Sequence, residues 1–187
     1  MEANVNDLIT INREFFRLAL NAELSCRVLR LLGASDAVAN KIRNSTEEGR
    51  ATAIKCRMPL VVLSDAAEEL FTRHPHDWPP DRKTVDLPED LRALTRFVLE
   101  VVWGMARLDL TIPQMQFGLS RHAVDDLSRY GVRDLYALAD RSTALLKLRA
   151  PLQPLIWDRL MIGARCEGPR ATRISQQTAI MTVGLEA

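Results

Sequence analysis

Apolar side chains recur at alternating spacings of three and four residues over the first thirty positions of the chain. This seam consists of Leu8, Ile11, Phe15, Leu18, Ala22, Ser25, Leu29 and Leu32. The spacing places all eight positions on one helix face and predicts a single long helix. Asn4 or Asn6 can cap this helix, and Gly33 can end it in left-handed geometry. The seam has two interpretations: a core helix of the monomer, or a dimerisation helix whose seam forms an oligomer interface.

Two shorter helices and an extended run follow. Ser35 is a suitable N-cap for a helix over residues 36–44, and Thr46 predicts another that runs to about Arg57. The β-branched run at residues 60–63 predicts a short extended segment. Together with the long helix, these elements form a predicted first module over residues 1–64.

Prolines and acidic residues gather after the first module. Pro75, Pro79 and Pro80 lie in this segment, so residues 65–87 are predicted to be an acidic linker or loop. Pro88 occupies a favoured first-turn position and predicts a second long helix to about Leu108, with a wide apolar face.

The second long helix opens a predicted second module over residues 88–165. The pair Ile112-Pro113 is expected to break the helix, and Ser120 and Gly131 then introduce two short helices over residues 121–130 and 132–141. An extended run is expected at residues 145–148. A last helix is predicted over residues 151–164, with an apolar face of Leu152, Leu155, Ile156 and Leu160. Residues 166–187 form a C-terminal tail without a clear period.

The two modules match without gaps when the sequence is shifted by 85 residues. Under this shift Gly33 falls on Gly118 and Ser35 on Ser120. At the aligned positions the two modules share physical character, such as apolar or turn-forming, more often than they share the same amino acid. The sequence therefore predicts an all-α fold built from a duplicated module. Each module has one long helix and two short helices of helix-turn-helix type, followed by an extended run.

Composition narrows the class of protein. The chain has 187 residues, 47% of them hydrophobic, and a formal net charge of +1. The polar start carries no apolar leader, and no apolar run approaches the roughly 20 residues of a membrane span. A cytoplasmic protein without membrane contact is expected. The three cysteines are far apart, so neither a disulfide framework nor a metal site is expected, and no cofactor motif occurs.

The near-neutral total conceals segregated charge. Residues 64–100 hold nine acidic and five basic residues, whereas residues 13–57 hold nine basic and five acidic ones. Of the 25 basic residues 21 are arginine, whose planar fork suits phosphate and guanine edges. The candidate DNA-binding residues of the second module are Arg121, His122, Arg129, Arg133, Arg141, Lys147 and Arg149. Those of the first module are Lys41, Arg43, Arg50, Lys55 and Arg57.

Two resemblances point toward transcription. The segments at residues 11–16 (INREFF), 31–35 (LLGAS) and 60–63 (LVVL) resemble FlhD, the partner of FlhC in an activator of flagellar genes, and residues 117–149 repeat that order. Pairs of this type also activate conjugative-transfer genes. The chain departs from the family in carrying two modules, and it lacks the zinc-binding cysteines of FlhC. Residues 119–127 and 131–135 are locally similar to the C-terminal domain of the RNA polymerase α subunit.

Two functions follow as expectations. The first is a non-enzymatic, DNA-binding transcriptional regulator of flagellar or conjugative-transfer type genes. It would act as a homo-oligomer or with an FlhC-like partner, and RNA polymerase is a further expected partner. The alternative is a protein-interaction module that does not bind DNA, such as an antiactivator, an adaptor or a secretion chaperone. An enzyme is not expected, because GxSxG, HExxH, Walker and GxGxxG motifs are missing from the sequence.

Overall fold

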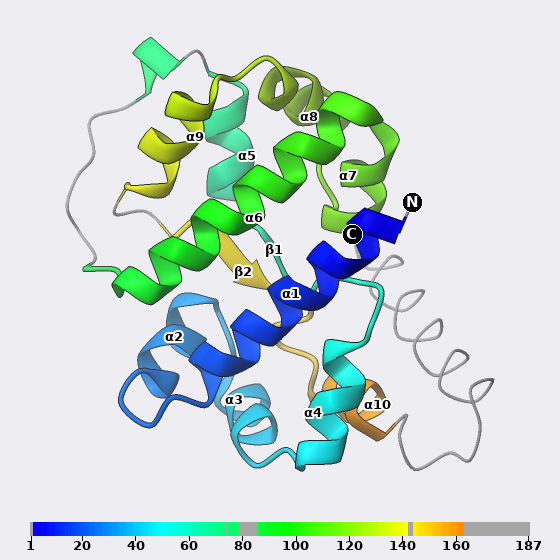
Figure 1. Cartoon of the computed structure of the whole chain (residues 1–187). Coiled ribbons are helices and arrows are strands. Elements are labelled where there is room, and N and C mark those ends of the chain that lie inside the picture. Colours follow the sequence, from blue (N-terminus) through cyan, green and yellow to red (C-terminus); the bar gives the residue numbers. More distant parts are fainter. Residues whose placement is uncertain (1, 74, 79–85, 142–143, 163–187) are drawn as a thin grey trace. The chain divides into compact units, whose positions relative to one another are not determined.

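The computed structural model describes residues 2–73, 75–78, 86–141 and 144–162 (Figure 1). In these ranges the chain is mostly helical and contains one two-stranded sheet, so the all-α expectation is confirmed. The described chain divides into two compact units. We call residues 8–60 and 148–162 the α3 unit, and residues 61–147, with the start of the first helix, the α8 unit. None of the described helices has the length and apolar character that crossing a membrane requires.

The α3 unit contains five helices. They are α1 (Glu2–Ala19), α2 (Ser25–Leu31), α3 (Asp36–Arg43), α4 (Glu47–Ile54) and α10 (Pro154–Ile162). The α10 helix packs against α3 and α4, although about 100 residues or more separate them in sequence. The side chains of Ser35 and Thr46 accept backbone N–H groups three residues ahead and thereby start α3 and α4, as predicted.

The predicted single helix through Leu32 is wrong, because α1 ends at Ala19 and α2 begins at Ser25. The Asn21 carboxamide oxygen accepts the N–H groups of Glu23 (2.9 Å) and Leu24 (3.2 Å), which gives the backbone a turn in place of helical bonds. Seven of the eight seam side chains are buried within this chain, and Ala22 is exposed. These seven side chains therefore lie in the core of the chain, as the core-helix interpretation predicts. An oligomer interface along the seam could form only if these side chains were first exposed.

The α8 unit is built around a long helix. Its elements are β1 (Val61–Leu63), α5 (Asp65–Phe71), the 3-10 turn η1 (Pro75–Asp77), α6 (Glu89–Leu108), α7 (Thr111–Phe117), α8 (Arg121–Ser128), α9 (Val132–Ala139) and β2 (Leu146–Leu148), whose last residue belongs to the α3 unit. Figure 1 shows α7, α8 and α9 grouped around α6, and these contacts bury one face of α6. The α5 helix packs on α8, and β1 pairs with β2.

Two predictions for the α8 unit are wrong. The expected linker over residues 65–87 begins with α5, which the Ser64 side chain caps at the Ala67 N–H and which buries Leu70 and Phe71. The acidic residues of this short helix interrupt its apolar positions, so its helical period is not visible in the sequence. The second long helix does end at Leu108, as predicted, but the Ile112-Pro113 pair is not what breaks it, because the pair lies inside the next helix, α7. Pro113 lies in the first turn of α7, where a missing N–H costs no hydrogen bond.

The face of the last helix also differs from the prediction. Ile156, Trp157 and Leu160 are buried, but Leu152 and Leu155 are 72% and 73% exposed. The helix starts at Pro154 rather than at residue 151, and the burial of Trp157 sets which side faces the core. The predicted end of this helix at residue 164 and the tail over residues 166–187 lie outside the described residues.

Corresponding elements of the two predicted modules have boundaries that differ by 85 residues. This offset relates α3 to α8, α4 to α9 and β1 to β2 at both ends of each element. Gly33 and Gly118 both have positive φ, of 80° and 71°, and Ser35 and Ser120 both cap the helix that follows. The duplication of the module itself stays a prediction.

Candidate nucleic-acid interface

Several of the twelve basic candidates form ion pairs with acidic residues of the same chain. Lys41 Nζ lies 2.6 Å from Asp158, and Lys147 Nζ lies 2.6 Å from Asp65. Arg129 pairs with Asp125 one turn earlier on α8, and His122 Nε2 lies 3.5 Å from Asp126. A cation that already faces a carboxylate adds little net attraction for DNA phosphates.

Other candidates are engaged by polar atoms or by burial. Arg43 donates to Asn40 Oδ1 at 2.6 Å and to Cys26 Sγ at 3.1 Å, while Arg50 donates to the Ser45 carbonyl at 2.6 Å. The guanidinium of Arg141 lies over the Trp78 ring, 5.9 Å from its centroid. Arg149 donates through Nε to the Pro59 carbonyl at 3.0 Å, and burial lowers the pKa of Arg149 to about 10. Arg149 is therefore a structural residue, and its guanidinium does not lie on an open face.

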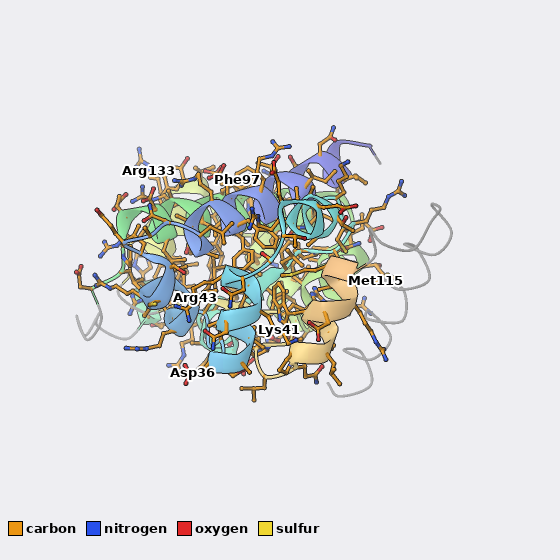
Figure 2. The ribbon with its side chains drawn as sticks, turned by 90° about the horizontal axis from the view of Figure 1, so that it is seen from below. Asp36, Lys41, Arg43, Phe97, Met115 and Arg133 are labelled. Carbon is orange, nitrogen blue, oxygen red and sulfur yellow. The ribbon has the colours of Figure 1, made fainter. Side chains whose placement is uncertain are left out.

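Apart from Arg43, which Asn40 engages, four basic candidates are exposed and have no carboxylate of the described residues within 4 Å. They are Arg121 and Arg133 in the α8 unit, and Lys55 and Arg57 in the α3 unit. Figure 2 shows Arg133 at the periphery of the ribbon. The twelve basic candidates are divided equally between the two units, with six in each.

The two exposed arginine candidates of the α8 unit without an ion pair to a described residue lie at the starts of helices. Arg121 is the first residue of α8, directly after its cap Ser120, and Arg133 is the second residue of α9, after Gly131. Backbone N–H groups at a helix start carry partial positive charge, which adds to the charge of a side chain placed there. A tight turn over residues 129–131 joins the two helices, so both belong to one helix-turn-helix element.

The α3 unit carries acidic residues at the equivalent places. The offset of 85 residues relates Arg121 to Asp36 at the start of α3, and Arg133 to Glu48 in the first turn of α4. Both acidic side chains are exposed. Figure 2 shows Asp36 at the edge of its helix. The same surface of the two modules therefore differs in the sign of its charge.

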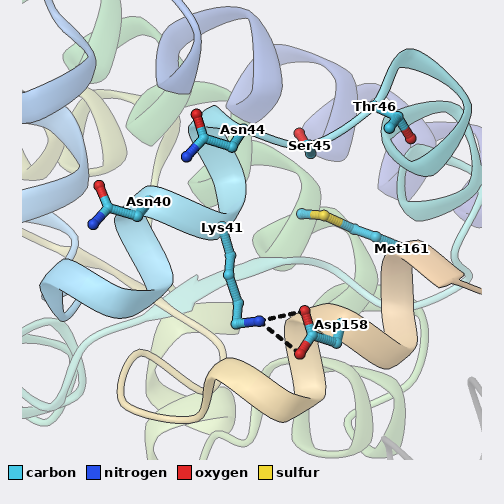
Figure 3. Close-up of a pocket in the computed structure, with 7 residues that line it drawn as sticks. All are labelled: Asn40, Lys41, Asn44, Ser45, Thr46, Asp158 and Met161. Carbon is cyan, nitrogen blue, oxygen red and sulfur yellow. Dashed lines mark hydrogen bonds and ion pairs between the residues drawn. The ribbon is translucent and has the colours of Figure 1, made fainter.

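A polar hollow in the α3 unit is the other candidate site (Figure 3). It encloses about 350 Å³, and its lining consists of Asn40, Lys41, Asn44, Ser45, Thr46, Asp158 and Met161. Both carboxylate oxygens of Asp158 lie 2.6 Å from Lys41 Nζ, and the Thr46 hydroxyl accepts the Gly49 N–H. The lining holds neither a cysteine nor a histidine, and the Ser45 hydroxyl donates to the Ile42 carbonyl at 2.5 Å. Within the described residues no group of three or more metal-ligating side chains occurs.

Exposed apolar side chains were not expected from the sequence. In the α8 unit Leu108 is 81% exposed and Met115 is 77% exposed, and Val132 and Tyr136 of α9 are also exposed. Figure 2 labels Met115. Pro113 and Phe117, four residues apart, form the buried side of α7, and Met115 lies on its outer side. Exposed apolar side chains are typical of contact with another protein where they form a contiguous patch.

Comparisons with protein-family models, with curated proteins and with solved structures find no match to this chain.

Proposed function

We propose that this protein is a DNA-binding regulator of transcription that acts through binding rather than through catalysis. One observation carries the proposal: Arg121 and Arg133 extend from the first turns of α8 and α9 without an ion pair to any described residue. These are the two helices of a helix-turn-helix element. Arginine at a helix start combines a side-chain cation with free backbone donors, and phosphate binds such a place well.

The proposal is narrower than the expectation from the sequence. The phosphate-contacting set shrinks from twelve residues to a core of Arg121 and Arg133, because ion pairs, backbone carbonyls or burial engage most of the others. The resemblance to FlhD supports regulation of flagellar or conjugative-transfer type genes, with an FlhC-like protein or RNA polymerase as the partner. We place the DNA contact in the α8 unit, since the equivalent surface of the α3 unit carries Asp36 and Glu48.

A pair of charge-reversal variants tests this assignment. The variant R121E/R133E and the control K55E/R57E change the net charge equally but lie in different units. Binding of a fluorescent duplex of mixed sequence is followed by anisotropy across a salt series. We expect R121E/R133E to lower affinity by at least about tenfold and to reduce the salt slope by about 0.9 for each phosphate that the protein no longer neutralises. The control should bind nearly as the wild type does.

Three outcomes are decisive for the proposal. Wild-type protein that shows no salt-dependent DNA binding contradicts the regulator function. Equal losses of affinity in the two variants contradict the assignment to the α8 unit and indicate a diffuse electrostatic attraction. A loss of affinity confined to R121E/R133E supports both parts of the proposal.

A protein-interaction module is the second candidate, and the exposure of Leu108 and Met115 favours it. Such a module would bind a partner through an apolar surface and would tolerate R121E/R133E. The variant L108S/M115S distinguishes the two functions, because it should leave DNA affinity unchanged. Lower self-association of this variant in light scattering, with DNA binding absent from the wild type, would favour the second candidate.

A further inference from the structure

The hydrogen bonds that flank the two strands are reciprocal. The Ser64 N–H donates to the Leu145 carbonyl at 2.8 Å, and the Arg149 N–H donates to the Leu60 carbonyl at 2.9 Å. Adding 85 to Ser64 gives Arg149, and adding 85 to Leu60 gives Leu145, so each bond is the counterpart of the other. The strands are therefore paired antiparallel, because the residue numbers in each bond have the same sum.

Side chains at the same positions repeat this reciprocity. The Ser64 hydroxyl donates to the Ala144 carbonyl at 3.1 Å, and Arg149 Nε donates to the Pro59 carbonyl at 3.0 Å. Pro59 and Ala144 are again 85 residues apart. Serine and arginine differ in size and charge, yet both anchor the segment after their own strand to the segment before the other strand.

Each strand leads into a helix that packs on short helices of the other module. Ser64 separates β1 from α5, and α5 packs on α8 of the second module. The Tyr130 hydroxyl lies 3.1, 3.0 and 2.7 Å from the carbonyl oxygens of Leu70, Phe71 and Arg73, at the end of α5. The helix that follows the first module's strand is thus bound within the α8 unit.

The reverse holds for the last helix of the second module. After β2 the chain continues into α10, which packs on α3 and α4 of the first module. Trp157 of α10 is fully buried, with its ring centroid 6.0 Å from that of Phe15. Asp158 of α10 forms the ion pair with Lys41 of α3.

We infer that each of two repeats ends with the helix that follows its strand, α5 in the first and α10 in the second, and that the repeats exchange these last helices, so that neither repeat completes its own core. The surface of α3 and α4 binds the helix that follows the second repeat's strand, and the surface of α8 binds the helix that follows the first repeat's strand. Each repeat is therefore the binding partner of the other, and the chain is a covalently joined form of a two-repeat dimer. This inference is independent of DNA binding.

Hydrogen exchange of the full chain, measured by mass spectrometry, tests the inference. The variants F71A and W157A each remove a fully buried aromatic side chain from one of the last helices. We expect F71A to speed amide exchange in α8 by tenfold or more and to leave α3 and α4 nearly unchanged. W157A should do the opposite, because local protection follows the packing of each cooperative unit.

Other patterns overturn the inference. Faster exchange of α3 and α4 in F71A, or of α8 in W157A, would mean that each helix serves its own repeat. Equal acceleration of both regions by each variant would contradict two exchanged units as well. If either alanine variant does not fold, the milder pair L70V and L160V gives the same comparison, because both residues are buried in these helices.

Discussion

The Asn12 carboxamide of α1 accepts the Leu60 N–H at 2.8 Å, directly before β1. The same side chain donates to the carbonyls of Cys56 (3.2 Å) and Met58 (3.0 Å) and is fully buried. One polar residue on the apolar face of α1 therefore satisfies the irregular backbone between α4 and β1. This bonding also explains why α4 ends at Ile54 and does not continue to Arg57.

Replacement of Asn12 by alanine should destabilise the protein strongly. The variant leaves two carbonyls and one N–H buried without their partner, and each such group costs about 1–3 kcal/mol. We expect the free energy of unfolding to fall by at least about 2 kcal/mol in urea titrations. The control N40A lies on the exposed side of α3 and should change stability by less than about 0.5 kcal/mol. Equal stabilities of N12A and N40A would contradict this role of Asn12.

Tyr130 should make stability depend on alkaline pH. Burial raises the pKa of the Tyr130 phenol above its ordinary value. Because the folded state favours the neutral phenol, this stabilisation is fully present below the unfolded pKa of about 10 and is lost as the pH rises through the folded pKa. Thermal unfolding of wild type and Y130F between about pH 8 and pH 11 measures the difference. The stability gap between them should narrow above about pH 10, and a constant gap would contradict the prediction.

Two residues with positive φ should respond to substitution in opposite directions. Ala150 has a φ of 57°, which costs a residue with a Cβ about 1 kcal/mol, so A150G should stabilise the chain by up to that amount. Gly118 has a φ of 71° and open space around its Cβ position, so G118A should lose about 1 kcal/mol through backbone strain alone. Urea unfolding measures both variants. Stabilisation by G118A, or marked destabilisation by A150G, would be inconsistent with this account.

Higher DNA affinity should follow from D36R/E48R. These substitutions give the α3 unit the charges that Arg121 and Arg133 give the α8 unit at equivalent positions. We expect the salt slope of DNA binding to steepen by up to about 0.9 for each further phosphate that the variant neutralises. The control E14R/E23R makes the same charge change outside these helix starts and should steepen the slope less. The same slope for both variants would show that only net charge matters.

The sequence alone determined the elements whose signals are local. Ser35, Thr46 and Ser120 mark the starts of α3, α4 and α8, because a cap acts on N–H groups only two or three residues away. The offset of 85 residues was also visible in the sequence, since core positions and turn glycines recur wherever the same packing recurs. The difference in charge between equivalent positions, such as Arg133 and Glu48, can also be read from the sequence alone.

Only the tertiary structure decided which helices pack together and which cations stay free. Lys41 meets Asp158 across 117 positions, and Lys147 meets Asp65 across 82. No local pattern encodes such pairs, because they depend on where α10 and α5 pack. Leu70 and Phe71 became core residues for the same reason: a seven-residue helix has too few turns to show a period, and packing on α8 selects its buried face.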